Sequence, residues 1–279
     1  MIPILMYHQV AEIPKKLDPL GLAVPPSQFE QQMSYLARNG YRCLTLPEAV
    51  RYFRRGGHAP ARSFVLTFDD GYQDVLSRAC PILEIFGFTA TVFLVAGCMG
   101  YASNWWGQEG ACSGLLLSWA EARDLARRGY ILGSHTLSHP FLNLLDDQSA
   151  FEEIRNSRML LQDQLDTQVD FFSYPFSETD TRIEGLVESA GYTAACAGDS
   201  GPCSVFHLWR VPCLRDDTTL SFALKVSGWY DKRTALREST SGRLLRHSVR
   251  MLRRRLNISQ PRRPVVLNHG LDREPEKGP

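Results

Sequence analysis

The sequence lacks the features that mark several large classes of protein. Its seven cysteines are odd in number and include no CxxC pair, which argues against a disulfide framework or a zinc knuckle. The formal net charge of +1 gives no basic excess of the kind that nucleic-acid binding requires. The first residues lack the basic region and cleavage site of a signal peptide, and their apolar run is too short to span a bilayer. We therefore expect no nucleic-acid partner and, if this is the native start, a cytoplasmic protein.

What is present is the composition of a globular protein with a sizeable core. Hydrophobic residues make up 44% of the 279 positions and charged residues 22%, and no internal repeat is visible. Short apolar runs alternate with amphipathic stretches, a pattern typical of βα units. We expect strands at 4–7, 63–68, 89–95, 130–134, 170–174 and 192–197.

Three helices have recognisable starts. Ser27, Thr45 and Ser118 are each followed three residues later by glutamate, as in a capping box. Alternating strands and helices predict a parallel sheet with right-handed crossovers, either doubly wound or closed into a barrel. In both architectures the chemistry gathers at the carboxyl ends of the strands.

Two groups of polar residues follow expected strands. Asp69 and Asp70 come after the run at 63–68, where the alternative is an ordinary turn with an aspartate cap. His135 and His139 are spaced i, i+4, which on a helical turn places both imidazoles on one face, although they could also be polar surface. Two histidines and one aspartate form the three-ligand set of a catalytic zinc site with an open position.

Both motifs, LTFDDG and SHTLSHP, resemble those of the polysaccharide deacetylase family, the NodB-homology domain of carbohydrate esterase family 4. The resemblance runs from about residue 1 to about residue 229. It implies an α/β fold, a distorted (β/α) barrel in a single domain at 1–230, which uses a divalent metal to remove acetyl groups. It also implies that Asp70, His135 and His139 bind the metal and that Asp69 is the general base. The metal predicted is Zn²⁺, although Co²⁺, Ni²⁺ or Mn²⁺ also suit such ligands.

A third family motif, Arg-x-Pro-Tyr, is altered here. The sequence reads Ser173-Tyr174-Pro175-Phe176, so the resemblance makes the N–H of Phe176 the donor to the oxyanion. The motif arginine, which orients the base in the family, is absent. Arg210, at the end of an expected late strand, is the candidate replacement; a surface salt bridge is the alternative.

The N-terminal segment MIPILMYHQV resembles the strand that carries the catalytic acid in a circularly permuted branch, the poly-N-acetylglucosamine deacetylases. That resemblance makes His8 the expected general acid, the group that protonates the leaving amine. His269, in VVLNH near the other end of the chain, is the rival candidate.

Four aromatic side chains have two interpretations each. Trp105 and Trp106 lie in a long Gly-rich loop, where they could form a platform for a sugar ring or fill the barrel mouth. Tyr174 and Trp209 could be pocket walls or core. Pro175 and Arg210 are also expected to line the substrate pocket.

The last stretch, 231–279, is expected to lie outside the barrel. Residues 242–258 combine an apolar stripe with six arginines, which suits either a helix on an anionic membrane or one packed on the barrel with a solvated face. The residues after it should include a short apolar strand and a disordered tail.

These features favour a metal-dependent deacetylase that acts on an N-acetylglucosamine-type sugar, in a cell-envelope glycan or on a polyprenyl phosphate. Alternatives are a deformylase or another amide or imide hydrolase on the same scaffold, and an inactive carbohydrate-binding barrel. A lipid-linked substrate would suit a protein at the inner face of the membrane. The sequence leaves the oligomeric state open.

Overall fold

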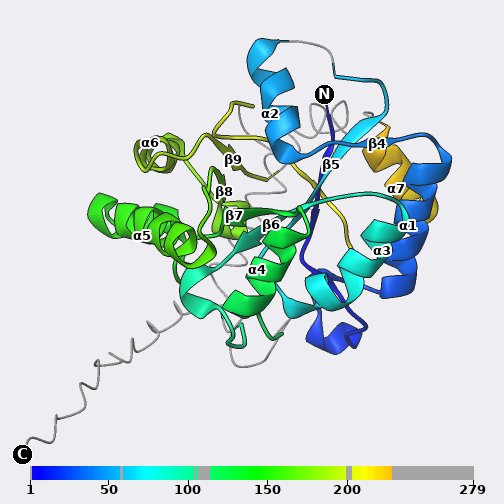
Figure 1. The fold of residues 1–279 in the computed structure, drawn as a ribbon, viewed down its shortest axis with the longest axis horizontal. Helices are drawn as coiled ribbons and strands as arrows, with labels where there is room; N and C mark the ends of the chain where they lie inside the picture. Colours follow the sequence, from blue (N-terminus) through cyan, green and yellow to red (C-terminus); the bar gives the residue numbers. More distant parts are fainter. Residues whose placement is uncertain (1, 57–58, 104, 106–113, 199–202, 228–279) are drawn as a thin grey trace, which may run out of the picture.

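Parallel strands form one curled sheet in the computed structural model, which describes residues 2–56, 59–103, 105, 114–198 and 203–227. The strand order is β10-β1-β5-β6-β7-β8-β9, with β4 beside β5, and β2 pairs with β3 in a small second sheet (Figure 1). The strands are β1 Ile4–Tyr7, β2 Gln9–Val10, β3 Ala23–Val24, β4 Arg42–Cys43, β5 Ser63–Phe68, β6 Thr91–Leu94, β7 Ile131–Ser134, β8 Phe171–Ser173, β9 Ala194–Cys196 and β10 Val211–Pro212.

The central strands are apolar because both of their faces are covered. Every residue of β1, β5 and β6 is buried, as expected for parallel strands that have helices on one side and barrel interior on the other. The predicted strands at 4–7 and 63–68 match the structure at both ends. The other four predicted strands exist but are shorter by one to three residues, because their flanking residues turn into loops.

One segment joins the two ends of the sheet. The Ala197 N–H donates to Leu208 O at 2.9 Å on the β9 side, and three residues later Val211 pairs with Leu5 of β1. The sheet is thereby curled into an incompletely closed half-barrel, which agrees with the distorted barrel expected from the sequence. Arg210 lies in this joining segment and precedes β10, so the expectation that it ends a strand was wrong.

Helices surround the sheet, with α1 and α7 adjacent on one side and α5 and α6 on another (Figure 1). They are α1 Pro26–Arg38, α2 Leu46–Arg55, α3 Cys80–Ile85, α4 Trp119–Arg127, α5 Asp147–Leu165, α6 Thr181–Ser189 and α7 Thr219–Val226. None of the helices in the described part of the chain has the length and hydropathy needed to cross a membrane.

Two of the three predicted helix starts are correct. Thr45 and Ser118 each form the expected capping box, in which the hydroxyl accepts from the third helical N–H and the glutamate there bonds back. The capping box at Ser27 was wrong. Helix α1 begins at Pro26 after Pro25 without a side-chain cap, because the fixed φ of proline suits the first helical position and its missing N–H needs no partner.

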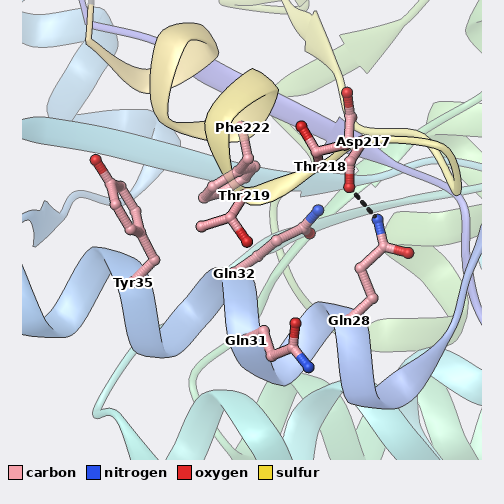
Figure 2. Close-up of a pocket in the computed structure, with 8 residues that line it drawn as sticks. All are labelled: Gln28, Gln31, Gln32, Tyr35, Asp217, Thr218, Thr219 and Phe222. Atoms are coloured by element: carbon pink, nitrogen blue, oxygen red, sulfur yellow. Dashed lines mark hydrogen bonds between the residues drawn. The ribbon is translucent and has the colours of Figure 1, made fainter.

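The helix pair α1 and α7 encloses a hollow of about 370 Å³ (Figure 2). Gln28 on α1 donates to the Asp217 carbonyl at 2.9 Å across one end of it. Gln32 accepts a hydrogen bond of 2.8 Å from the buried Tyr7 hydroxyl of β1. None of the predicted active-site residues that the structure describes lines this hollow.

Candidate active site

The predicted site residues lie where their strands end. His8 follows β1, Asp69 and Asp70 follow β5, and the segment 135–139 follows β7. Because these strands run parallel in the same sheet, their carboxyl ends share one edge of the barrel. The topology therefore brings together residues that are separated by more than a hundred positions in the sequence.

Asp70, His135 and His139 form a buried cluster. Each offers one ligand atom, and these atoms lie within 4.8 Å of one another. His139 Nε2 is 3.2 Å and His135 Nε2 is 3.4 Å from the same oxygen, Asp70 Oδ1. Among the described residues this is the one cluster of three such side chains, so the structure brings together the three ligands predicted from the sequence.

The two histidines reach Asp70 by a route that the sequence argument did not foresee. Their segment is an irregular loop, not the helical turn that the i, i+4 spacing suggested. Thr136 and His139 adopt left-handed conformations, with φ of 69° and 61°. Such conformations cost non-glycine residues on the order of 1–3 kcal/mol each, so the surrounding structure has to hold the loop in place.

The cluster fits a divalent cation on its hydrogen bonding alone. His135 Nδ1 lies 2.8 Å from the Ser173 carbonyl, which fixes the proton on Nδ1 and leaves the Nε2 lone pair facing Asp70. Both Asp70 oxygens are buried, and no described residue gives either of them a hydrogen bond. Lone pairs that converge without a donor repel one another unless a cation lies between them.

Asp69, the adjacent carboxylate, is satisfied by protein groups. Arg210 donates from Nη1 to Oδ1 and from Nη2 to Oδ2, both at 2.7 Å, in the two-point geometry that guanidinium and carboxylate favour. Both residues are buried, and Arg210 has no exposed surface. The proposed replacement for the motif arginine therefore contacts Asp69, and the alternative of a surface salt bridge is wrong.

Charge neighbours set the pKa values in the cluster. Burial acts to raise the pKa of Asp69, but Arg210 and then His135 lower it below the ordinary value. Burial also opposes ionisation of Asp70, yet contacts with His135 and His139 hold its pKa well below normal. Both aspartates are therefore anionic at neutral pH.

The same neighbouring charges and burial shift the pKa values of the three histidines in different directions. Burial lowers the pKa of His139 and outweighs the effect of Asp70. For His135, burial is outweighed by Asp69 and Asp70, and the net pKa is raised. Burial lowers the pKa of His8, although the charges of Asp70 and Asp69 act on it in the opposite direction. His8 thus lies within electrostatic reach of both carboxylates.

Ser173 occupies the position of the missing motif arginine and connects the two parts of the site. Its hydroxyl accepts from Arg210 Nη2 at 2.9 Å and donates to Asp69 at 3.3 Å, while its carbonyl holds His135. No role was predicted for Ser173 from the sequence. A small side chain here leaves room for the guanidinium that arrives from the segment before β10.

Phe176 lies in a turn beside the cluster. It belongs to the 3-10 turn Pro175–Ser177, and its backbone is left-handed, with φ of 58°. Its ring packs edge-on against His139, with centroids 4.6 Å apart. The residue predicted to carry the oxyanion donor is therefore next to a predicted metal ligand.

Two of the expected pocket residues are core. Trp105 is only 2% exposed and stacks on His139 with ring centroids 4.5 Å apart, a placement that favours the filling interpretation over the platform. Tyr174 is fully buried, and its hydroxyl donates to Phe206 O at 2.8 Å. Pro175 is buried in the turn below Phe176. Trp209 is partly exposed beside Arg210.

Three further expectations concern residues outside the described part of the chain. They are Trp106, His269 and the stretch 231–279, with its basic segment 242–258, its short apolar strand and its tail.

Comparison with known proteins agrees with this geometry. The family model for polysaccharide deacetylases matches residues 56–195, half of the chain, and that span carries both predicted motifs. The chain belongs to the polysaccharide deacetylase family. YxkH of Bacillus subtilis is 29% identical over 203 residues, which are 73% of this chain and 66% of that protein.

Two further comparisons show how much of this chain and of each similar protein is covered. The poly-beta-1,6-N-acetyl-D-glucosamine N-deacetylase of Escherichia coli K12 is 29% identical over 134 residues, 47% of this chain and 20% of that enzyme. The structure of IcaB from Ammonifex degensii superposes with a TM-score of 0.68 at 22% identity, over 82% of this chain and 97% of IcaB. That likeness shows a shared fold. The chain spans just under two thirds of YxkH and a fifth of the E. coli enzyme.

Proposed function

We propose that this polysaccharide deacetylase is a metal-dependent N-deacetylase of an N-acetylglucosamine-type sugar. The observation that carries the proposal is the convergence of Asp70, His135 and His139 on one point beside an arginine-paired Asp69. Family membership supports the reaction, and the E. coli relative supports the sugar. The substrate would be a cell-envelope glycan or a lipid-linked sugar.

Asp70, His135 and His139 would hold the metal, for which Zn²⁺ is the first candidate and Co²⁺, Ni²⁺ and Mn²⁺ are alternatives. A bound divalent cation polarises the acetyl carbonyl and lowers the pKa of water. Asp69 then accepts a proton from the attacking water. Its bidentate pairing with Arg210 keeps it ionised and directs its remaining lone pairs, so Arg210 acts on the reaction through the base.

The remaining steps use groups at neighbouring strand ends. The N–H of Phe176 would donate to the oxygen that becomes negative as water adds to the carbonyl. His8 would protonate the amine as the C–N bond breaks. The lowered pKa of His8 makes its protonated form a stronger acid but a less populated one at neutral pH.

The test is acetate release from β-1,6-linked N-acetylglucosamine oligomers with and without added Zn²⁺. Asp69→Asn should lose activity by about 10²–10⁴-fold, the usual contribution of a general base, and chelation should abolish it. Release of formate from N-formyl analogues would identify a deformylase instead. Binding of the oligomer with no release of acid would identify an inactive binding barrel.

The same assay separates the two candidate acids. We expect His8→Ala to lower acetate release and His269→Ala to leave it unchanged. Full activity of the His8→Ala variant would transfer the role away from His8.

Contact of residues 242–258 with the inner face of an anionic membrane remains a prediction from the sequence. Flotation of the full chain with anionic liposomes, compared with a variant that lacks 242–258, tests it. Equal flotation would remove membrane contact from the proposal.

A further inference from the structure

A carboxylate outside the cluster binds the loop that carries both histidines. Glu153 lies on the second turn of α5 and points at the loop 135–139. Its Oε2 accepts from the backbone N–H groups of Leu137 at 3.1 Å and Ser138 at 2.9 Å. Its Oε1 accepts from the Ser138 hydroxyl at 2.7 Å. One side chain thus makes three hydrogen bonds to two consecutive residues between the histidines.

These bonds explain how the strained loop keeps its shape. Consecutive backbone N–H groups that follow a left-handed residue form a concave anion site, and here the anion is supplied by the protein itself. The left-handed residue is Thr136, and its hydroxyl accepts from the His139 N–H at 2.9 Å. Without Glu153, two N–H groups lose a charged acceptor in a partly buried place.

Backbone groups that follow β6 also hold the loop. The N–H groups of Ala96 and Gly97, which follow β6, donate to the carbonyls of Thr136 and Leu137 at 3.0 and 2.8 Å. A Cβ on Gly97 would come within 2.6 Å of the Leu137 carbonyl, so this contact requires glycine. Glu153 therefore adds a second set of hydrogen bonds to this loop, and these bonds can be removed by a point mutation without a steric clash.

We propose that Glu153 is a positioning residue that orients His135 and His139 for the metal. The inference rests on the proposed metal site and extends it to a residue on α5 that touches neither substrate nor metal. Groups that orient metal ligands typically change metal affinity by 10–100-fold when they are removed. Glu153 differs from ordinary helix carboxylates because all three of its bonds go to one loop.

The experiment measures Zn²⁺ affinity of the full chain by competition with a chelating dye, in the absence of substrate. We expect Glu153→Ala to weaken Zn²⁺ binding by roughly 10–100-fold. Glu153→Gln keeps one acceptor oxygen, and Ser138→Ala removes one of the three bonds, so both should lie between Glu153→Ala and the unmodified protein. The matched control is Glu152→Gln, because Glu152 is the exposed neighbour on α5 and, among the described residues, accepts a hydrogen bond from Gln148 and none from the histidine loop.

A second readout separates positioning from general stability. The visible spectrum of the Co²⁺-loaded protein should change in Glu153→Ala. The unfolding midpoint of the metal-free protein should change little. Unchanged Zn²⁺ affinity and an unchanged Co²⁺ spectrum in Glu153→Ala and Glu153→Gln would overturn the inference and leave the proposed function intact. Absence of Zn²⁺ binding in the unmodified protein would overturn both.

Discussion

Asp69 and Asp70 are adjacent in the chain and both are buried, but their carboxylates have different partners. Asp69 receives two hydrogen bonds from Arg210 and one from Ser173. Asp70 faces two imidazoles and receives no hydrogen bond from any described residue. The Asp69 carboxylate has its hydrogen-bond partners within the protein, whereas the Asp70 carboxylate needs a bound cation to balance its charge. This contrast separates a proton acceptor from a metal ligand more sharply than sequence order does.

The largest expected effect compares the same substitution at the two positions in the metal-free protein. Asp69→Asn leaves the Arg210 guanidinium buried without a counter-ion and should cost about 3–5 kcal/mol of unfolding free energy. Asp70→Asn removes a carboxylate to which no described residue donates a hydrogen bond, although its contacts with His135 and His139 are lost as well, so the cost should be clearly smaller than that of Asp69→Asn. Urea unfolding after metal removal measures both.

Equal losses at the two positions would contradict the contrast. If Asp69→Asn unfolds the protein, Arg210→Met in the same background restores neutrality at this buried site. The double variant should recover much of the stability without recovering activity.

The members of the cluster could be predicted from the sequence because they follow expected strands of a parallel sheet. Parallel strands end at one edge, so Asp70, His135 and His139 could be brought together without knowledge of the loops. Arg210 could be proposed only because the resemblance showed that an arginine was missing. Its distance of 141 positions from Asp69 leaves no local signal.

Other features depended on tertiary packing that a single sequence does not encode locally. The sequence around Trp105 fits either a platform for a sugar or a side chain that fills the barrel mouth, and only its stacking on His139 favours the second. Glu153 reads as an ordinary helix carboxylate because its partners lie 15 and 16 positions away on another element. The backbone of the histidine loop was missed because the i, i+4 spacing also fits a loop with two left-handed residues.

An intermediate effect concerns pH and the Asp70 side of the cluster. A metal requires neutral imidazoles, and the raised pKa of His135 extends upward the pH range in which this ring carries a second proton that has to leave before a metal binds. Zn²⁺ affinity should therefore fall as the pH drops through the pKa of His135, by on the order of tenfold per pH unit for each proton released. Asp70 should not contribute above pH 5, because its pKa is held well below the normal value.

Calorimetry in buffers of different ionisation enthalpy counts the protons released on Zn²⁺ binding. A pH-independent affinity between pH 5 and 8 would show that neither histidine loses a proton and would remove His135 from the ligand set.

The smallest effect is expected at Trp105, the wall behind His139. Trp105→Phe keeps an aromatic ring against the imidazole and removes an indole N–H that is buried without a partner among the described residues. Loss of packing volume and removal of an unsatisfied donor act in opposite directions, so unfolding free energy should change by only about 1 kcal/mol. Because the ring is covered, KM for N-acetylglucosamine oligomers should stay constant. A raised KM with unchanged Zn²⁺ affinity would mean that substrate reaches this ring and that the loop opens during turnover.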